Sequence, residues 1–182
     1  MVNIYKLKLT ILQQEILRLL FVKTGTSLNQ RQISRALEVT QPAIMKAIPE
    51  LEEKGLIKIR QDSETKRWSI ELNRDNHKTV HLKRADNLKQ IYESGLADFL
   101  EKEFAGATII LFGSFSKGED LVNSDIDIAV VGRKDKKIDV ANYEKILERA
   151  IHISFYDSFR KLHRNLKESL CNGIIIKGWI EI

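Results

Sequence analysis

The chain has 182 residues, 43% hydrophobic and 30% charged, which is the composition of a soluble globular chain with one large or two small domains. It has neither an apolar run long enough to cross a membrane nor the apolar core of a signal peptide, and its single cysteine, Cys171, excludes a disulfide framework. We therefore expect a cytoplasmic protein. The net charge of +5 is uneven, because residues 1–75 hold 13 Lys and Arg against 9 Asp and Glu, which points this segment toward a polyanion.

The first segment predicts three helices followed by a hairpin. Apolar residues recur at helical spacing in three stretches, and two alternating stretches then predict paired strands. The expected helices cover 10–22, 29–37 and 40–55, and the expected strands cover 56–60 and 67–72. Pro49 falls inside the third helix, where we expect a bend or an early weakening because proline removes a helical hydrogen bond.

Three helices and a hairpin form the layout of a winged helix-turn-helix. The stretch 41–57, which ends in Leu51-Glu-Glu-Lys-Gly-Leu-Ile57, resembles the recognition helix and the start of the wing in MarR-like and ArsR-like transcription regulators. The resemblance covers about residues 8–73 and implies double-stranded DNA as a partner. The alternative is a winged helix used only for protein contact or dimerisation.

Particular side chains of this domain are candidates for DNA contact. A recognition helix reaches base edges in the major groove with residues near its N-terminal half, and a wing contacts phosphate or the minor groove. The candidates are Thr40, Gln41, Met45 and Lys46 on the helix and Lys58, Arg60, Lys66 and Arg67 on the wing. For each of them the alternative is an ordinary solvated surface residue.

Residues 76–94 predict a helical connector and a candidate contact in a homodimer. Apolar residues continue at helical spacing beyond Gly95, where we expect the first helix of the next domain. His77 and His81 are four residues apart, as in some metal sites, but no third ligand lies nearby, which favours surface histidines.

The strongest chemical pattern lies in residues 108–131. An apolar strand leads to Gly113-Ser114 and a short helix, and a second strand carries Asp125 and Asp127. Residues two apart on a strand project to the same side, so these two carboxylates lie together and repel unless a divalent cation sits between them. A Gly-Ser turn before a helix offers close backbone approach, N–H groups and a hydroxyl to a phosphate. The pattern predicts a site for phosphate and metal.

Gly113-Ser114, a gap and Asp125-Ile-Asp127 resemble the signature of the DNA polymerase β-like nucleotidyltransferases, most closely their minimal, small-domain branch. The resemblance implies an NTP held by Gly113, Ser114 and Lys117, and Mg2+ or Mn2+ held by Asp125 and Asp127. It also implies a candidate small helical partner protein, because minimal members often pair with one in toxin–antitoxin systems. The alternative is a surface Asp-x-Asp on an edge strand, which explains neither the Gly-Ser nor the apolar run before it.

The third carboxylate of this family is missing or displaced. In active members it sits on a later strand, where it helps to bind metal and can take the proton from the attacking hydroxyl. The matching stretch, Ile151-His-Ile-Ser-Phe155, carries no acid. His152 is one candidate for assisting deprotonation, and Asp157 is the other, provided that the chain bends.

We therefore expect an α+β chain of two domains: a winged helix at 1–75, a helical connector at 76–94, and a nucleotidyltransferase-fold mixed sheet with flanking helices at 95–182. Two functions remain open. The favoured one is a DNA-binding enzyme that transfers a nucleoside monophosphate from an NTP to a hydroxyl acceptor with Mg2+. The alternative is a transcription regulator or antitoxin-like protein whose degenerate nucleotidyltransferase domain binds nucleotide or a partner protein.

Overall fold

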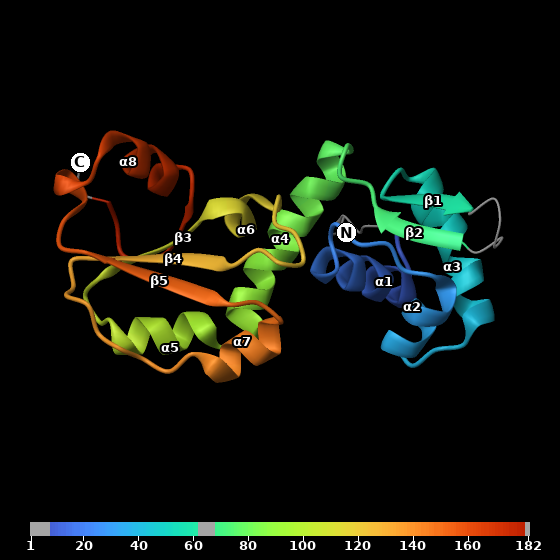
Figure 1. Ribbon diagram of the computed structural model, residues 1–182, viewed down its shortest axis with the longest axis horizontal. Coiled ribbons are helices and arrows are strands. Elements are labelled where there is room, and N and C mark those ends of the chain that lie inside the picture. The colour runs from blue at the N-terminus through green and yellow to red at the C-terminus, as the bar shows by residue number, and fades with distance from the viewer. Residues whose placement is uncertain (1–7, 62–67, 181–182) are drawn as a thin grey trace, which may run out of the picture. The chain divides into compact units, whose positions relative to one another are not determined.

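The computed structural model describes residues 8–61 and 68–180 of the chain (Figure 1). The chain divides into two compact units, Met1–Thr79 and Val80–Ile182, each with its own core. No helix in the described ranges is long and apolar enough to span a bilayer.

The first unit holds three helices and a two-stranded antiparallel hairpin. Its elements are α1 (Ile11–Val22), α2 (Gln30–Ala36), α3 (Gln41–Glu53), β1 (Ile57–Gln61) and β2 (Trp68–Leu72). The side chains of Thr10, Asn29 and Thr40 cap the three helices by accepting a hydrogen bond from the backbone N–H three residues later. Each such cap contributes about 1 kcal/mol of helix stability.

The core of the first unit follows the predicted apolar stripes. Ile16, Ile33, Ile44 and Leu51 from the three helices pack with Ile70 of β2, and all five are fully buried. Ile70 also pairs with Leu28 through two backbone hydrogen bonds, which ties the segment before α2 to the hairpin.

Pro49 lies inside the third helix, which ends shortly before Gly55 as expected. α3 continues through it to Glu53, with Ile48 and Leu51 buried on either side of the proline. The proline ring lies on the exposed face of the helix, where the carbonyl that loses its partner can bind water.

The second unit is a four-stranded sheet with helices on both faces (Figure 1). Its elements are α4 (His77–Glu93, from Val80 onward), α5 (Leu96–Glu103), β3 (Thr108–Phe112), α6 (Gly113–Lys117), β4 (Ile126–Val131), α7 (Ala141–Leu147), β5 (Ile151–Tyr156), a 3-10 turn (Phe159–Lys161), α8 (Arg164–Cys171) and β6 (Ile174–Lys177). The strand order is β5-β4-β3-β6, with β4 and β5 parallel and the other neighbours antiparallel. The predicted mixed sheet with flanking helices is confirmed.

Alternation along the strands divides this unit into two cores. Ile109 and Leu111 of β3 and Ile128 of β4 pack in the cluster that contains Leu96 and Leu100 of α5. The residues between them pack on the opposite face, where Ile110, Ala129 and Val131 meet Phe159 and Leu170. Asp127 has the same parity as Ala129 and Val131, so it projects from the face that α8 covers further along the sheet.

Candidate functional site

The turn between β3 and α6 brings backbone directly against a carboxylate. Gly113 has a φ of +74°, a left-handed conformation, and a Cβ atom at this position would overlap the Oδ2 atom of Asp127. The Ser116 hydroxyl donates a hydrogen bond of 2.9 Å to the Gly113 carbonyl and braces the turn. The backbone conformation therefore favours glycine at position 113, and a side chain there would have to displace the Asp127 carboxylate.

Asp127 lies in an electrostatically unfavourable place for an anion. It pairs with Phe112 across β3 and β4, and it is half-buried, whereas Asp125 just before the strand is exposed. Burial raises the pKa of Asp127, the charge of Asp125 raises it further, and His152 lowers it in part. A bound cation would relieve the repulsion between the two carboxylates.

His152 stands beside Asp127 in the sheet. The parallel register of β4 and β5 pairs Asp127 with His152, and paired residues of adjacent strands project from the same face. His152 therefore lies beside Asp127, on the strand that the family resemblance matches to the one with the third carboxylate.

The structure does not bring Asp157 to this group. It follows Tyr156, which pairs with Val131 at the far end of β4, about 13 Å along the strand from Asp127. The Asp157 side chain is exposed there. No bend brings it back, because β5 runs parallel to β4 through Tyr156.

Ser114 and Lys117 lie near opposite ends of α6. Ser114 follows Gly113 directly and is half-buried, so its hydroxyl belongs to the turn. Lys117 is the exposed last residue of the helix, about 4.5 Å further along its axis. Lys117 is therefore outside the turn, and its ammonium reaches toward the turn only through its long side chain.

The donor set fits one hard cation shared with phosphate rather than a cage made by the protein. In the described part of the chain no three His, Cys, Asp or Glu side chains converge as a metal-binding group. Two carboxylates, at Asp125 and Asp127, leave the remaining positions of an octahedral Mg2+ to phosphate oxygens and water, which is how that ion is often held.

The exposed face of α3 carries most of the helix residues predicted to contact DNA. Gln41, Met45 and Lys46 are exposed, and Met45 is 54% exposed although it is a large apolar side chain. Thr40 is committed to the helix cap, where its Oγ1 accepts from the Ala43 N–H at 3.4 Å. On the wing, Arg60 is an exposed residue of β1 whose guanidinium lies 3.6 Å from Glu71. Lys66 and Arg67 lie outside the described residues.

Two family models match the chain, one for each unit. Residues 9–67 match the MarR family, and residues 93–176 match the nucleotidyltransferase domain. The first unit is thus similar to the MarR family, and the second is similar to the nucleotidyltransferase domain. The predicted resemblance of the two domains to these two families is thus confirmed.

Solved structures of regulators also resemble the chain. A Staphylococcus aureus MepR–DNA complex is 27% identical, with 52% of this chain and 81% of that chain covered and a TM-score of 0.38. A point mutant of Lactococcus lactis ZitR is 22% identical, with 58% of this chain and 68% of that chain covered and a TM-score of 0.43. The transcriptional regulator BldR from Sulfolobus solfataricus is 22% identical, with 52% and 63% covered and a TM-score of 0.38. No curated protein matched the sequence.

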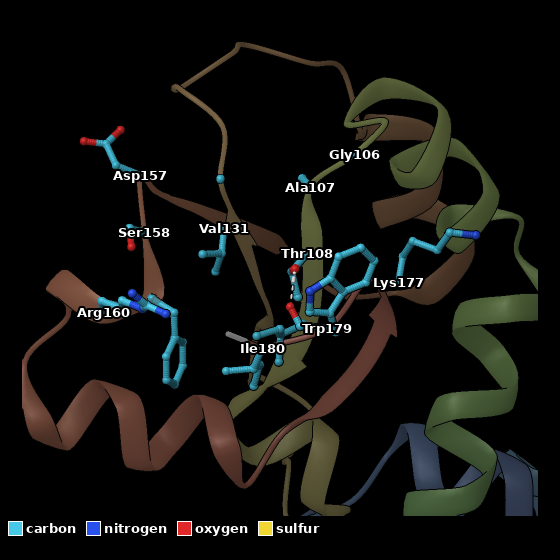
Figure 2. Close-up of a pocket in the computed structure, with 14 residues that line it drawn as sticks. Gly106, Ala107, Thr108, Val131, Asp157, Ser158, Arg160, Lys177, Trp179 and Ile180 are labelled. Carbon is cyan, nitrogen blue, oxygen red and sulfur yellow. Dashed lines mark hydrogen bonds between the residues drawn. The ribbon is translucent and has the colours of Figure 1, made fainter. Parts of the chain in front are cut away.

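The nucleotidyltransferase domain also has a hollow of about 490 Å³ that the sequence did not reveal (Figure 2). It lies at the start of β3 and the ends of β4 and β5, so it is at the opposite end of the sheet from Asp127. Thr108 Oγ1 donates a hydrogen bond of 2.7 Å to the Trp179 carbonyl on its wall, and Asp157 lies at its rim. The residues of the hollow come from four separate segments, which local patterns cannot bring together.

Proposed function

We propose that this chain is a DNA-binding transcription regulator whose nucleotidyltransferase domain binds a nucleoside triphosphate with one Mg2+ or Mn2+ ion. One observation carries the proposal: the Asp127 carboxylate lies against the Gly113 turn, while its register partner on β5 is His152 rather than an acid. Two-metal phosphoryl chemistry needs shared carboxylates that hold ions about 4 Å apart. Two carboxylates beside a phosphate turn support nucleotide binding better than rapid transfer.

Each part of the site has a role in this proposal. The backbone at Gly113 and the Ser114 hydroxyl contact the phosphates, and Lys117 approaches them from the end of α6. Asp125 and Asp127 hold the cation, whose chemistry is to neutralise phosphate charge. Burial that raises the pKa of Asp127 also makes a cation beside it more stabilising, because an opposite charge offsets the cost of burying an anion.

The exposed side of α3 is proposed to enter the major groove of double-stranded DNA. Gln41 suits bidentate contact with adenine, and Lys46 suits phosphate or guanine. Arg60 on β1 is proposed to contact phosphate. We also propose a cytoplasmic location. We propose a homodimer, because dimeric regulators read two half-sites. Tyr92 of α4, which is 50% exposed, offers apolar surface for such a contact.

Equilibrium binding of each of the four common NTPs, with and without Mg2+, tests the nucleotide site. We expect micromolar to millimolar binding that requires Mg2+ and weakens about tenfold or more in Asp127→Ala, because a charge-assisted contact contributes about 1.5–3 kcal/mol. Asp157→Asn is the matched control, since it alters a carboxylate at the other end of the same sheet. Equal weakening in both variants, or no binding to the wild type, would contradict the proposal.

Nucleoside monophosphate transfer is the second candidate function. The two carboxylates of the family pattern are present, and His152 lies in register with Asp127, where it is placed to take a proton. Labelled NTP, Mg2+ and cell extract test for transfer, which should disappear in Asp125→Ala and Asp127→Ala. His152→Asp restores the third acid of active family members. If the missing acid is what limits transfer, this variant should transfer faster than the wild type.

DNA binding is tested by its salt dependence. The apparent affinity of the full chain for a duplex should fall linearly in a double-logarithmic plot against salt, in proportion to the phosphates neutralised. Lys46→Ala should reduce that slope by about one. The control is Lys54→Ala at the C-terminal end of the same helix, where Lys54 is paired with Glu50 at 3.0 Å. An affinity for DNA that does not change with salt concentration would exclude this mode of binding.

A further inference from the structure

A cluster of buried charged and polar groups joins α4 to the segment that follows α6. Lys83, Asn87 and Asp120 are each no more than 2% exposed. The Lys83 ammonium pairs with Asp120 Oδ1, and Asn87 Nδ2 donates to the same oxygen at 2.7 Å. Removing two charges from water costs several kcal/mol per ion, so the contacts must be well made to be retained.

The same cluster also contacts α6. Asn87 Nδ2 also donates to the Phe115 carbonyl, in the middle of α6, at 2.9 Å. Gly118, the C-cap of α6, packs so closely on α4 that a Cβ atom would lie 2.6 Å from the Val80 carbonyl oxygen and 2.7 Å from the Arg84 nitrogen. Figure 1 shows α6 beside α4 in the second unit. α6 is thus held at its middle and at its C-terminal end by one longer helix.

The opposite end of α6 is the phosphate turn. α6 has only five residues and begins at Gly113, so a small rotation of the helix would move the turn relative to Asp127. A five-residue helix has little stability of its own and depends on its packing. Phe115 of α6 is also buried in the core beneath β3 and β4, so the contacts from α4 and from the sheet together set where the Gly113 and Ser114 backbone points.

We propose that Lys83, Asn87 and Asp120 are positioning residues for the nucleotide site, because they hold α6 in the orientation that places the Gly113–Ser114 turn beside Asp127. This inference rests on the nucleotide binding proposed above. In the proposed site these three residues contact neither the phosphate nor the cation. They act through the α6 backbone, so removing them should reduce nucleotide affinity without removing any ligand of the nucleotide.

The test compares Asn87→Leu with Gln90→Leu in the full chain. Both residues are buried amides of α4, but Gln90 Nε2 donates at 2.7 Å to Asp86 on the same helix rather than to α6. We measure the free energy of unfolding, the affinity for Mg·ATP, and amide hydrogen exchange of residues 113–117 without nucleotide. Asn87→Leu leaves the buried Phe115 carbonyl and Asp120 without a donor and should cost about 1–3 kcal/mol. Gln90→Leu should cost less, because Asp86 is only half-buried and can bind water instead.

Only Asn87→Leu should affect the turn. We expect exchange at 113–117 to accelerate about tenfold and the affinity for Mg·ATP to fall about tenfold, whereas Gln90→Leu should change either by less than about twofold. The double variant Lys83→Met and Asp120→Asn removes the Lys83–Asp120 pair with little change of shape. It leaves the buried guanidinium of Arg149, which lies 3.6 Å from Asp120 Oδ2 in the wild type, beside a neutral amide, so we expect this variant also to lose stability. It should reproduce the effects of Asn87→Leu on exchange and affinity in a folded chain.

Two failures are distinguishable. The inference is overturned if Asn87→Leu and the double variant show wild-type exchange and affinity. It is also overturned if they change exchange and affinity no more than Gln90→Leu does. In both cases the cluster is only structural, and the proposed function stands. If the wild-type chain binds no nucleotide with Mg2+, the proposed function fails and the inference fails with it.

Discussion

At the scale of single residues, the site depends on how closely a glycine and a carboxylate approach. A side chain at position 113 would displace Asp127, and Asp127 in turn carries an unfavourable charge unless a cation is present. The burial and the neighbouring charge of Asp125 both disfavour the ionised form of Asp127. Strain and like charges of this kind tend to persist where function requires them.

Gly113→Ala should destabilise the chain more than Gly132→Ala. Both glycines have positive φ, +74° and +89°, so each alanine should cost about 1–2 kcal/mol from conformation alone. A Cβ atom at Gly132 meets nothing within 4 Å, whereas one at Gly113 overlaps Asp127, which should add about 1–3 kcal/mol. Denaturant unfolding of the two variants measures the difference. Equal losses would show that Asp127 moves aside at little cost.

Asp127→Asn should stabilise the metal-free chain at neutral pH. The folded pKa of Asp127 is raised by burial and by Asp125, so the folded state binds this proton more tightly than the unfolded state. Ionised Asp127 therefore opposes folding, and this cost disappears as pH falls through the raised pKa. The stability advantage of the variant should vanish in acid, as thermal melts across pH would show. A variant that is less stable than wild type at neutral pH would contradict this sign.

At the scale of elements, α3 tolerates a proline in its interior because the packing of its buried face is strong. Ile44, Ile48 and Leu51 anchor the helix on the core, and Pro49 faces outward between them. Tertiary packing thereby outweighs the local preference of proline to end a helix. The helix that carries the predicted DNA contacts thus retains a weak point of its own.

Pro49→Ala should stabilise the chain by about 1–3 kcal/mol, because it restores a helical hydrogen bond and removes a steric conflict. The gain is reduced slightly by the greater freedom of alanine in the unfolded chain. Pro42→Ala is the matched control, since Pro42 lies in the first turn of α3, where proline is tolerated. Chemical denaturation should show a gain for the first variant and almost none for the second. A loss on Pro49→Ala would mean that the proline shapes the helix usefully.

At the scale of the whole molecule, one helix belongs to both units. The boundary between the units falls after Thr79, while α4 begins at His77 and continues without interruption to Glu93. On the first-unit side, Asn73 and Asn76 each donate a hydrogen bond to the Gly55 carbonyl, at 2.8 and 2.9 Å, just after α3. On the second-unit side, the cluster around Asp120 fastens the same helix to α6.

We propose that Mg·ATP changes the affinity of the chain for DNA by about threefold or more, since α4 continues in the chain from the first unit into the second. Thermodynamic linkage requires DNA to change the affinity for Mg·ATP by the same factor, so fluorescence anisotropy with each ligand in turn provides an internal check. Asp127→Ala should abolish both effects while leaving DNA binding without nucleotide unchanged. Identical DNA affinity with and without saturating nucleotide would show that the two units act independently.

The sequence alone determined most of the local structure and the resemblance of each domain to its family. Helix caps at Thr10, Asn29 and Thr40, the hairpin, and the order of strand, Gly-Ser turn and Asp-x-Asp strand are properties of neighbouring residues. These patterns act over a few residues, so the order of the chain is enough to read them. The helix around Pro49 is held by packing against distant residues, which a local pattern cannot show.

Only the tertiary structure decided which distant residues meet. The parallel register of β4 and β5 places His152 beside Asp127 and sends Asp157 to the far end of the sheet. Lys83 and Asp120 are 37 residues apart in the chain, yet they pair in the interior. Strand order and register are set by how whole faces of the sheet are buried. A pattern confined to one strand therefore cannot reveal which residue will stand next to it.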